Sequence, residues 1–165
     1  MRASPLQVKT IGILSISIEP RRLVEGEKRA PKFDWDGVTI ETQTHHEQRS
    51  KDEGANLYIV GLDLDIPNKE IEGATLAPYK ISISGWGLFE WNGETEAAED
   101  VLDQVVVNGT SMIYGTFREM ISMVSSRMIN GMLQLPTATF FDHKPSLDVN
   151  APKTKRKTPS PPPIK

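Results

Sequence analysis

The stretch from residue 108 to residue 140 reads NGTSMIYGTFREMISMVSSRMINGMLQLPTATF, and it decides the fold. Its apolar residues recur at intervals of three and four, which places them on one face of a helix over 110–129. We expect this helix to begin at Asn108 or Thr110 and to stop at Asn130-Gly131, since these residue types cap helix ends. The residues predicted to face the core are Ile113, Phe117, Met120, Ile121, Val124 and Met128.

Methionine is concentrated in this stretch, since five of the six methionines in the chain lie between Met112 and Met132. Its side chain is unbranched and polarizable, so it can fill irregular gaps in a core or adapt to partners of different shape. For any single methionine a place in the core is the simpler interpretation. The cluster as a whole favours a surface that adapts to its partners.

Length and composition narrow the class of protein. A chain of 165 residues with 38% hydrophobic residues is long enough for one domain with a sizeable core. Cysteine is absent, which excludes disulfides, thiolate metal sites and cysteine nucleophiles. No stretch approaches the about 20 apolar residues of a membrane span, and the N-terminus lacks the apolar core of a secretory signal. We therefore expect a cytoplasmic protein without membrane insertion.

Charge is distributed unevenly along the chain, although its net charge is only −3. Residues 151–165 (APKTKRKTPSPPPIK) carry four lysines and one arginine but no acid. Such a segment buries too little apolar surface to fold, and it is either a solvated end or a contact for acidic proteins or lipid head groups, with nucleic acid the least expected partner. We expect an extension over 1–9, a folded domain over 10–143 and an unfolded basic tail over 144–165.

Four segments alternate apolar and polar residues in the manner of half-buried strands. The fourth carries Gly85 and Gly87 on its apolar face, which leaves room for the helix to lie close. Trp86 and Leu88 make its opposite face partly apolar, so we expect that face to be a subunit contact or a binding groove. The prediction is an α+β protein in which a four-stranded antiparallel sheet carries one long helix. The predicted strands are 11–19 with a bulge near Gly12 to Leu14, 38–49, 57–66 and 79–91, and a short acidic helix is expected over 94–106.

The long connection over 21–37 contains two aromatic residues, Phe33 and Trp35, in otherwise polar surroundings. Two interpretations are open. In the simpler one, the loop tucks both rings under the sheet. In the other, the rings line a groove beside the edge of the sheet.

Candidate catalytic and metal-binding residues are few. His45 and His46 are neighbours on one predicted strand and point to opposite faces, so they do not readily bind one metal ion. Asp63 and Asp65 share a face, as a carboxylate pair for acid–base chemistry would, but the sequence supplies no partner acid, nucleophile or ligand. No glycine-rich phosphate loop is present. The sequence therefore predicts no catalytic site, no metal, no cofactor and no nucleotide use.

The stretch that decides the fold resembles the hallmark stretch of the SecB-type protein-export chaperones. In that family an aromatic-Ala-Arg-Glu run enters a long helix, followed by a Ser-Arg pair, a break, Leu-x-Leu-x-Pro and an ending in phenylalanine. Phe33 and Trp35 fall where the family has an aromatic pair, Gly87 and Phe89 match the end of its fourth strand, and the resemblance covers about residues 10–143. The matches in the hallmark stretch are Phe117, Arg118, Glu119, Ser126, Arg127, Leu133, Leu135, Pro136 and Phe140.

The resemblance implies both a function and an assembly. SecB-type chaperones are ATP-independent holdases that bind unfolded polypeptides in apolar grooves, and they form a homotetramer, a dimer of dimers with helices between the sheets. Such a site needs exposed aromatic and flexible apolar side chains and an available strand edge. The residues that we expect to contact clients are Phe33, Trp35, Trp86, Leu88, Met123 and Leu133.

Three departures from the family pattern change the expected partners. Gly115-Thr116 replaces a proline near the start of the helix, and the sequence after Phe140 is too polar and proline-rich for the family's second, lid-forming helix. The acidic tail that many members present to the export motor ATPase is replaced by a basic one. This favours a specialised member outside general export, such as one that guards an antitoxin, and the export motor stays a candidate partner.

Two other interpretations stay open. In the first, the chain is a structural oligomer whose apolar surfaces serve only its own assembly. In the second, which has less support, it is a small enzyme that uses Asp63, Asp65 and a histidine.

Overall fold

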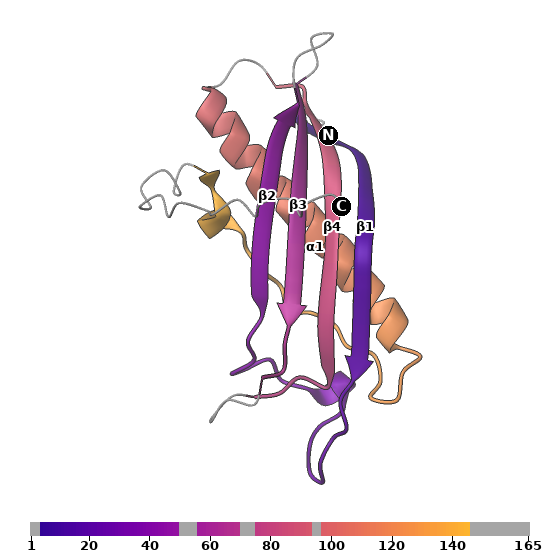
Figure 1. The fold of residues 1–165 in the computed structure, drawn as a ribbon. Coiled ribbons are helices and arrows are strands. Elements are labelled where there is room, and N and C mark those ends of the chain that lie inside the picture. Colours follow the sequence, from indigo (N-terminus) through magenta and orange to yellow (C-terminus); the bar gives the residue numbers. More distant parts are fainter. Residues whose placement is uncertain (1–3, 50–55, 70–74, 94–96, 146–165) are drawn as a thin grey trace, which may run out of the picture.

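The computed structural model describes residues 4–49, 56–69, 75–93 and 97–145. They form two layers, a four-stranded sheet and one long helix that crosses a single face of the sheet obliquely (Figure 1). The strand order is β1-β4-β3-β2, and all neighbouring strands are antiparallel, so the predicted fold class is confirmed. The elements are β1 (Leu6–Pro20), η1 (Ala30–Lys32), β2 (Glu41–Arg49), β3 (Asn56–Ile66), β4 (Tyr79–Trp91), α1 (Ala98–Ser125) and η2 (Phe141–His143), where η marks a short 3₁₀ helix.

The core lies between the sheet and α1. Alternate residues of β4 are buried beneath the helix, and cross-strand partners share their side, as Ile83 does with Ile16 of β1 and Leu64 of β3. Removing such apolar surface from water contributes about 25 cal/mol for each Å². From α1 the core receives Ile113, Phe117 and Ile121, which are fully buried as predicted.

α1 is one continuous helix of 28 residues, whereas the sequence predicts two helices, the second starting at Asn108 or Thr110. That prediction is wrong because tertiary packing holds the helix together at its middle. A Cβ atom at Gly109 would lie 3.1 Å from the side chains of Phe89 and Val60. The glycine is therefore the point at which α1 lies closest to the sheet, and this contact outweighs its low helix propensity.

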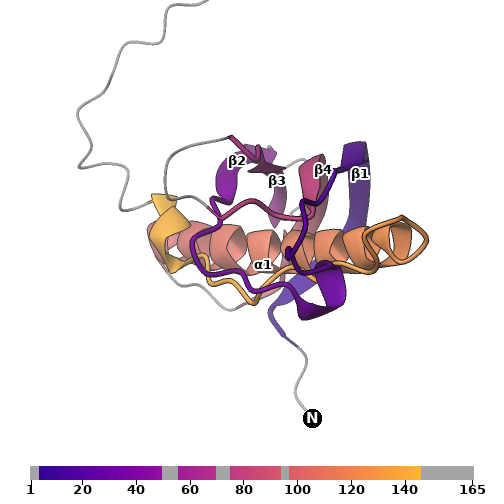
Figure 2. The same cartoon turned by 90° about the horizontal axis from the view of Figure 1, so that it is seen from below.

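The C-terminal end of α1 extends beyond the edge strand β1 (Figure 2). Val124, which was predicted to face the core, is therefore 36% exposed. The helix ends at Ser125, before the predicted stop at Asn130-Gly131. Gly131 does adopt a left-handed conformation, with a φ of 83°, but it closes the turn that follows the helix.

β1 begins at Leu6, inside the region predicted as an extension over 1–9. Its register against β4 shifts at two places, after Val8 and after Ile13. The second shift is the predicted bulge, and it leaves the side chain of Leu14 largely exposed. The bulges interrupt the regular ladder along an edge of the sheet, which hinders uncontrolled pairing with other chains.

After α1 the chain returns along the helix as an extended segment over 132–140 (Figure 1). Side chains of the helix hold the backbone of this segment, which explains why the helix motif and the Leu-x-Leu-Pro motif occur together. Among the hydrogen bonds that the segment's carbonyl oxygens accept from helix side chains, Leu133 O accepts from Ser122 Oγ (3.1 Å), Leu135 O from Arg118 Nε (3.0 Å) and Pro136 O from the hydroxyl of Tyr114 (2.7 Å).

The other residues of the hallmark stretch differ in their burial. The ring of Phe140 closes the core, edge-on to Tyr114 at 5.3 Å between centroids. Glu119 and Arg127 are exposed. After Phe140 the chain forms the short η2, and the tail predicted over 144–165 lies outside the described residues from residue 146 onward.

Asn130 joins three segments at one end of the molecule. Its buried Nδ2 donates to the carbonyl oxygens of Arg21 and Pro78, both at 2.7 Å, and its own carbonyl accepts from Ala30 N at 3.0 Å. Replacing Asn130 with alanine removes both side-chain bonds and leaves Arg21 O without this donor, while Pro78 O keeps its bond from Arg21 N at 2.9 Å. We expect the free energy of unfolding in urea to fall by about 2 kcal/mol.

The matched control for this prediction is Asn92→Ala. Asn92 is exposed, and its amide makes only a long bond of 3.4 Å to Glu90. Its replacement is expected to change the free energy of unfolding by less than about 0.5 kcal/mol. Equal effects of the two substitutions would show that Asn130 does not hold these segments together.

Candidate binding surfaces

One flank of α1 is lined with methionines. The spacing of Met112, Met120 and Met123 places them on the side of the helix opposite Arg118 and Ser122, which hold the returning segment. Met112 is 36% exposed and Met123 is 55% exposed, while Met120 is half-buried. These three residues, called the methionine flank below, form a flexible apolar surface on the folded chain.

β1 adds apolar side chains and an unpaired backbone edge. α1 crosses the sheet obliquely and covers only part of β1 (Figure 1). Val8 and Ile16 consequently remain exposed on this strand. Among the described strands, β1 pairs only with β4, so its other side offers backbone donors and acceptors that no described strand uses. An extended polypeptide can add to such an edge through its own backbone.

The side of the sheet away from α1, called the outer face below, is not covered by any described element (Figure 1). One half of the outer face is apolar, as the alternation of residues along β4 predicts for Trp86 and Leu88. Trp86 has glycines as both cross-strand partners, Gly12 on β1 and Gly61 on β3. A Cβ atom at Gly12 would lie 3.3 Å from Trp86 Nε1, so the indole lies against that strand. The half-buried apolar residues here are Leu57, Ile59, Trp86 and Leu88.

The other half of the outer face is polar and hollowed. Its concavity has a volume of ≈ 560 Å³. The hydroxyls of Ser15 and Ser84 are 2.9 Å apart across β1 and β4. Carboxylates from β2 and β3 line the opposite side of the hollow, namely Glu41, Asp63 and Asp65.

Folding brings His45 and Asp63 together on this face, with His45 Nε2 at 3.0 Å from Asp63 Oδ2. Ser84 is the cross-strand partner of Asp63 on the next strand. The carboxylate therefore lies between the imidazole and the hydroxyl, whereas an activated serine needs the imidazole in the middle. His46 faces the other side of β2, as predicted. The pair does not have the geometry of a serine hydrolase.

Phe33 and Trp35 follow η1 in the loop that joins β1 to β2, and both pack against the core. Their rings meet edge to face, 5.3 Å apart at an angle of 79°. Trp35 Nε1 donates to Gln134 O at 3.1 Å, which ties the loop to the returning segment. Phe33 also lines a hollow of ≈ 370 Å³ beside Leu76. Both rings thus pack against the core, in line with the first interpretation, and Phe33 also lines a hollow, in line with the second.

The rim of that hollow is charged. The guanidinium of Arg21 donates to both carboxylate oxygens of Glu27, at 2.8 and 3.0 Å. This hydrogen bonding lowers the pKa of Glu27 from its ordinary value, against a smaller opposing effect of burial. Glu27 therefore keeps its charge into mildly acidic solution, and the loop stays anchored there.

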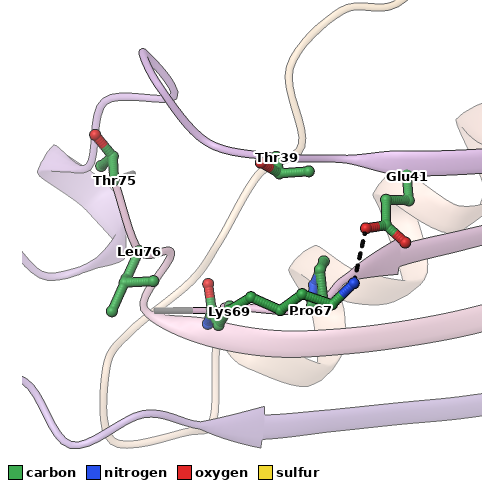
Figure 3. A pocket seen from close by; sticks show the side chains of 7 residues that line it. Thr39, Glu41, Pro67, Lys69, Thr75 and Leu76 are labelled. Carbon is green, nitrogen blue, oxygen red and sulfur yellow. Dashed lines mark hydrogen bonds and ion pairs between the residues drawn. The ribbon is translucent and has the colours of Figure 1, made fainter. Parts of the chain in front are cut away.

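A smaller cavity of ≈ 80 Å³ lies where β2 begins and β3 ends (Figure 3). Thr39, Pro67 and Leu76 contribute to its wall, and Lys69 Nζ bridges to Glu41 Oε1 at 3.3 Å across its mouth. At about 30 Å³ for one water in the liquid, such a space holds two or three waters. It is too small to receive a polypeptide segment.

The residues predicted to contact clients lie on three separate surfaces. Phe33 and Trp35 are together in the loop after η1, and the outer face holds the Trp86–Leu88 pair. Met123 belongs to the methionine flank. Leu133 is only 1% exposed because it packs into the core beneath α1, so its assignment as a client contact is wrong for this fold.

Several apolar residues on these surfaces were missed by the sequence-based prediction. Leu57 and Ile59 occupy positions of β3 that share a face with Asp63, and their apolar character at those positions is the signal that marks them. Val8 and Ile16 carry no comparable signal, because their exposure depends on how α1 crosses the sheet.

Metal and membrane sites were sought in the same residues. Within the described ranges, no three His, Asp or Glu side chains are close enough to hold a metal ion. No helix of the described chain is both long and apolar enough to cross a membrane.

No family model and no curated protein sequence matches the chain. Two solved structures are similar. One is a SecB-like chaperone from Mycobacterium tuberculosis in complex with a peptide of the HigA1 antitoxin, with a TM-score of 0.49 and 18% identity, covering 81% of this chain and 91% of that one. The other is a protein of unknown function from Streptococcus agalactiae, with a TM-score of 0.54 and 9% identity, covering 80% and 97%.

At these identities the likeness concerns the arrangement of strands and helix alone. The activity has to be inferred from the surfaces of this chain.

Proposed function

We propose that the protein is an ATP-independent holdase chaperone of the cytoplasm, which binds unfolded polypeptides on its exposed apolar surfaces. The observation that carries the proposal is the methionine flank on a fold whose strand β1 has a free edge. Flexible methionines accept apolar segments of many shapes, and a strand edge bonds any backbone. Neither feature depends on a particular client sequence.

Two further surfaces extend the proposed binding area. The hollow beside Phe33 accepts an apolar side chain at the end of the sheet. Trp86 and Leu88 offer a flatter apolar contact on the outer face. Because these surfaces lie on different sides of the protomer, a long unfolded client can engage several of them, which raises the overall affinity.

We further propose a homotetramer, a dimer of dimers with its helices between the sheets. Val124, Ile129 and Met132 are exposed at the end of α1 and in the turn that follows it. Clustered apolar side chains of this kind favour coverage by a second protomer. A clean monomer in a mass measurement at micromolar protein would contradict this assembly.

The proposed clients are unfolded polypeptides, either chains destined for export or one dedicated partner such as an antitoxin. The basic composition of residues 151–165 favours the dedicated partner, because the family members that serve the export motor commonly carry an acidic tail. This choice rests on the sequence resemblance.

Suppression of client aggregation, followed by light scattering, tests the proposal. We expect stoichiometric amounts of the protein to suppress aggregation of a denatured client. Replacing Met112 and Met123 together with serine should weaken suppression about tenfold, which corresponds to about 1.4 kcal/mol of lost binding free energy. Both side chains are exposed, so the stability of the fold should change by less than about 0.5 kcal/mol for each.

The matched control is Val24→Ser. Val24 is 66% exposed and lies in the loop after β1, on none of the proposed surfaces. Its replacement should leave suppression unchanged. If the protein does not suppress aggregation, and its oligomer also fails to bind a hydrophobic dye, the surfaces serve assembly and the holdase proposal is wrong.

A further inference from the structure

The outer face of the sheet changes its chemistry along the direction of the strands. Around Asp65 and Asp63 it presents carboxylates and hydroxyls over the hollow. Further along the strands, Gly61 of β3 pairs with Trp86 of β4, and Ile59 of β3 then pairs with Leu88 of β4. A ligand that lies along β3 would therefore meet first acids and then an aromatic and aliphatic surface.

The polar half keeps an excess of negative charge. Of the carboxylates at the hollow, Glu41 pairs with Lys69 at 3.3 Å and Asp63 pairs with His45 at 3.0 Å. Both ion pairs are largely exposed to solvent, so the close contact neutralises little of the negative charge of Glu41 and Asp63. Asp65 forms no ion pair with any residue that the structure describes. A cationic segment is the complementary partner for this half.

The described chain ends beside the edge strand β2, on the side of the sheet that faces α1, because Thr44 pairs with the buried Leu62. His143 Nδ1 lies 3.2 Å from Thr44 Oγ1, which fixes η2 against the edge strand β2. The rings of Phe140 and His143 meet edge to face, 5.4 Å apart between centroids, and hold the same turn. Pro145, the last described residue, therefore follows directly from an anchor on β2, beside the strand that carries Asp63.

We propose that residues 151–165 dock on the outer face of the same chain's sheet. Their chemistry runs in the same order as that of the face. The cationic run 153–157 (KTKRK) comes first and matches the acidic hollow, and the run 159–164 (PSPPPI) comes next and matches the Trp86 half. Proline-rich segments bind aromatic surfaces at low entropic cost, because their backbone is already restricted.

The lengths agree with this docking. Seven residues lie between Pro145 and Lys153, and these eight steps span up to about 26 Å when extended. This length allows the chain to pass around the edge strand β2 from the helix side to Asp63, which lies one strand spacing, about 5 Å, inside β2. Four residues of polyproline helix beyond Lys157 cover about 12 Å. The distance along β3 from Asp63 to Ile59 is about 13 Å, so the proline run reaches the apolar half as the cationic run occupies the hollow.

Carbodiimide cross-linking of the full chain, read by peptide mass spectrometry, tests the docking without any client. The reagent joins a lysine amine to a carboxylate only when the two are in contact. We expect Lys153, Lys155 or Lys157 to be joined to Asp63, Asp65 or Glu41. In an equal mixture of ¹⁴N- and ¹⁵N-labelled protein, the joined peptides should come from one chain. Their yield should fall several-fold near 1 M salt, where the Debye length is about 3 Å.

Two variants make the test specific. Asp63→Asn with Asp65→Asn should remove most of these cross-links, whereas Asp34→Asn with Asp36→Asn, an equal change of charge in the loop after η1, should leave them unchanged. Cross-links mainly to Glu99 and Asp100, cross-links between differently labelled chains, or no cross-links to the hollow would each overturn the proposal. A holdase assay that fails while the cross-links form would reject the proposed function and leave the docking intact.

Discussion

Replacing Phe117 with alanine is expected to lower the free energy of unfolding by about 3–5 kcal/mol. The phenyl ring is fully buried at the centre of α1. It lies against β4 so closely that a Cβ atom at Gly85 would be 2.9 Å from it. Its removal would leave a cavity between the helix and the sheet that neither rigid element can collapse to fill.

The measurement is urea unfolding at one fixed protomer concentration, because the proposed oligomerisation would make the apparent stability depend on concentration. Phe141→Ala is the matched control, because the ring of Phe141, which follows Phe140 in the chain, is 64% exposed. Its replacement should change the free energy of unfolding by less than about 0.5 kcal/mol. If both variants lose equally little, Phe117 is not the central contact between α1 and the sheet.

Gly85→Val is the second substitution expected to have a large effect, a loss of about 3 kcal/mol or more. A Cβ atom at Gly85 would lie 2.8 Å from the backbone oxygen of Gly12 and 2.9 Å from Phe117. The oxygen belongs to β1, which is paired with β4, and the ring is held in the core, so neither moves without breaking other contacts. The added methyl groups would force the helix and the sheet apart.

Gly115→Val is the control for this prediction. Gly115 lies on the exposed side of α1, and nothing lies within 4 Å of a Cβ atom at that position. Valine has a somewhat better helix propensity than glycine, so the change in the free energy of unfolding should be about 0.5 kcal/mol or less, towards higher stability. Thermal and urea unfolding of both variants give the comparison. A Gly85 variant as stable as its control would mean that α1 does not pack on β4 as described.

The sheet and the inner side of the helix could be predicted because each depends on a local period. Ile113, Phe117 and Ile121 follow the helical repeat, and the alternation in β4 distinguishes Ile83 from Trp86. Both periods reflect the geometry of the backbone and need no knowledge of distant residues. The bulge near Leu14 was visible as a change of parity in the same way.

The errors arose where distant residues decide the outcome. A helix start was predicted at Asn108 or Thr110 because these residue types cap helices locally, but the packing of Phe89 and Val60 against Gly109 continues one helix through this point. Leu133 was assigned to an exposed surface because an extended segment has no preferred face until its hydrogen bonds to α1 are known. The register between β2 and β3, which brings His45 to Asp63, likewise cannot be derived from either strand alone.

The proposed holdase binds unfolded polypeptide through its exposed apolar side chains. The most direct test titrates the protein into a dye-labelled, permanently unfolded polypeptide and follows fluorescence anisotropy. We predict saturable binding without nucleotide, about tenfold weaker for the Met112→Ser, Met123→Ser double variant and unchanged for Val24→Ser. No rise in anisotropy at micromolar protein, or equal binding by both variants, would contradict it.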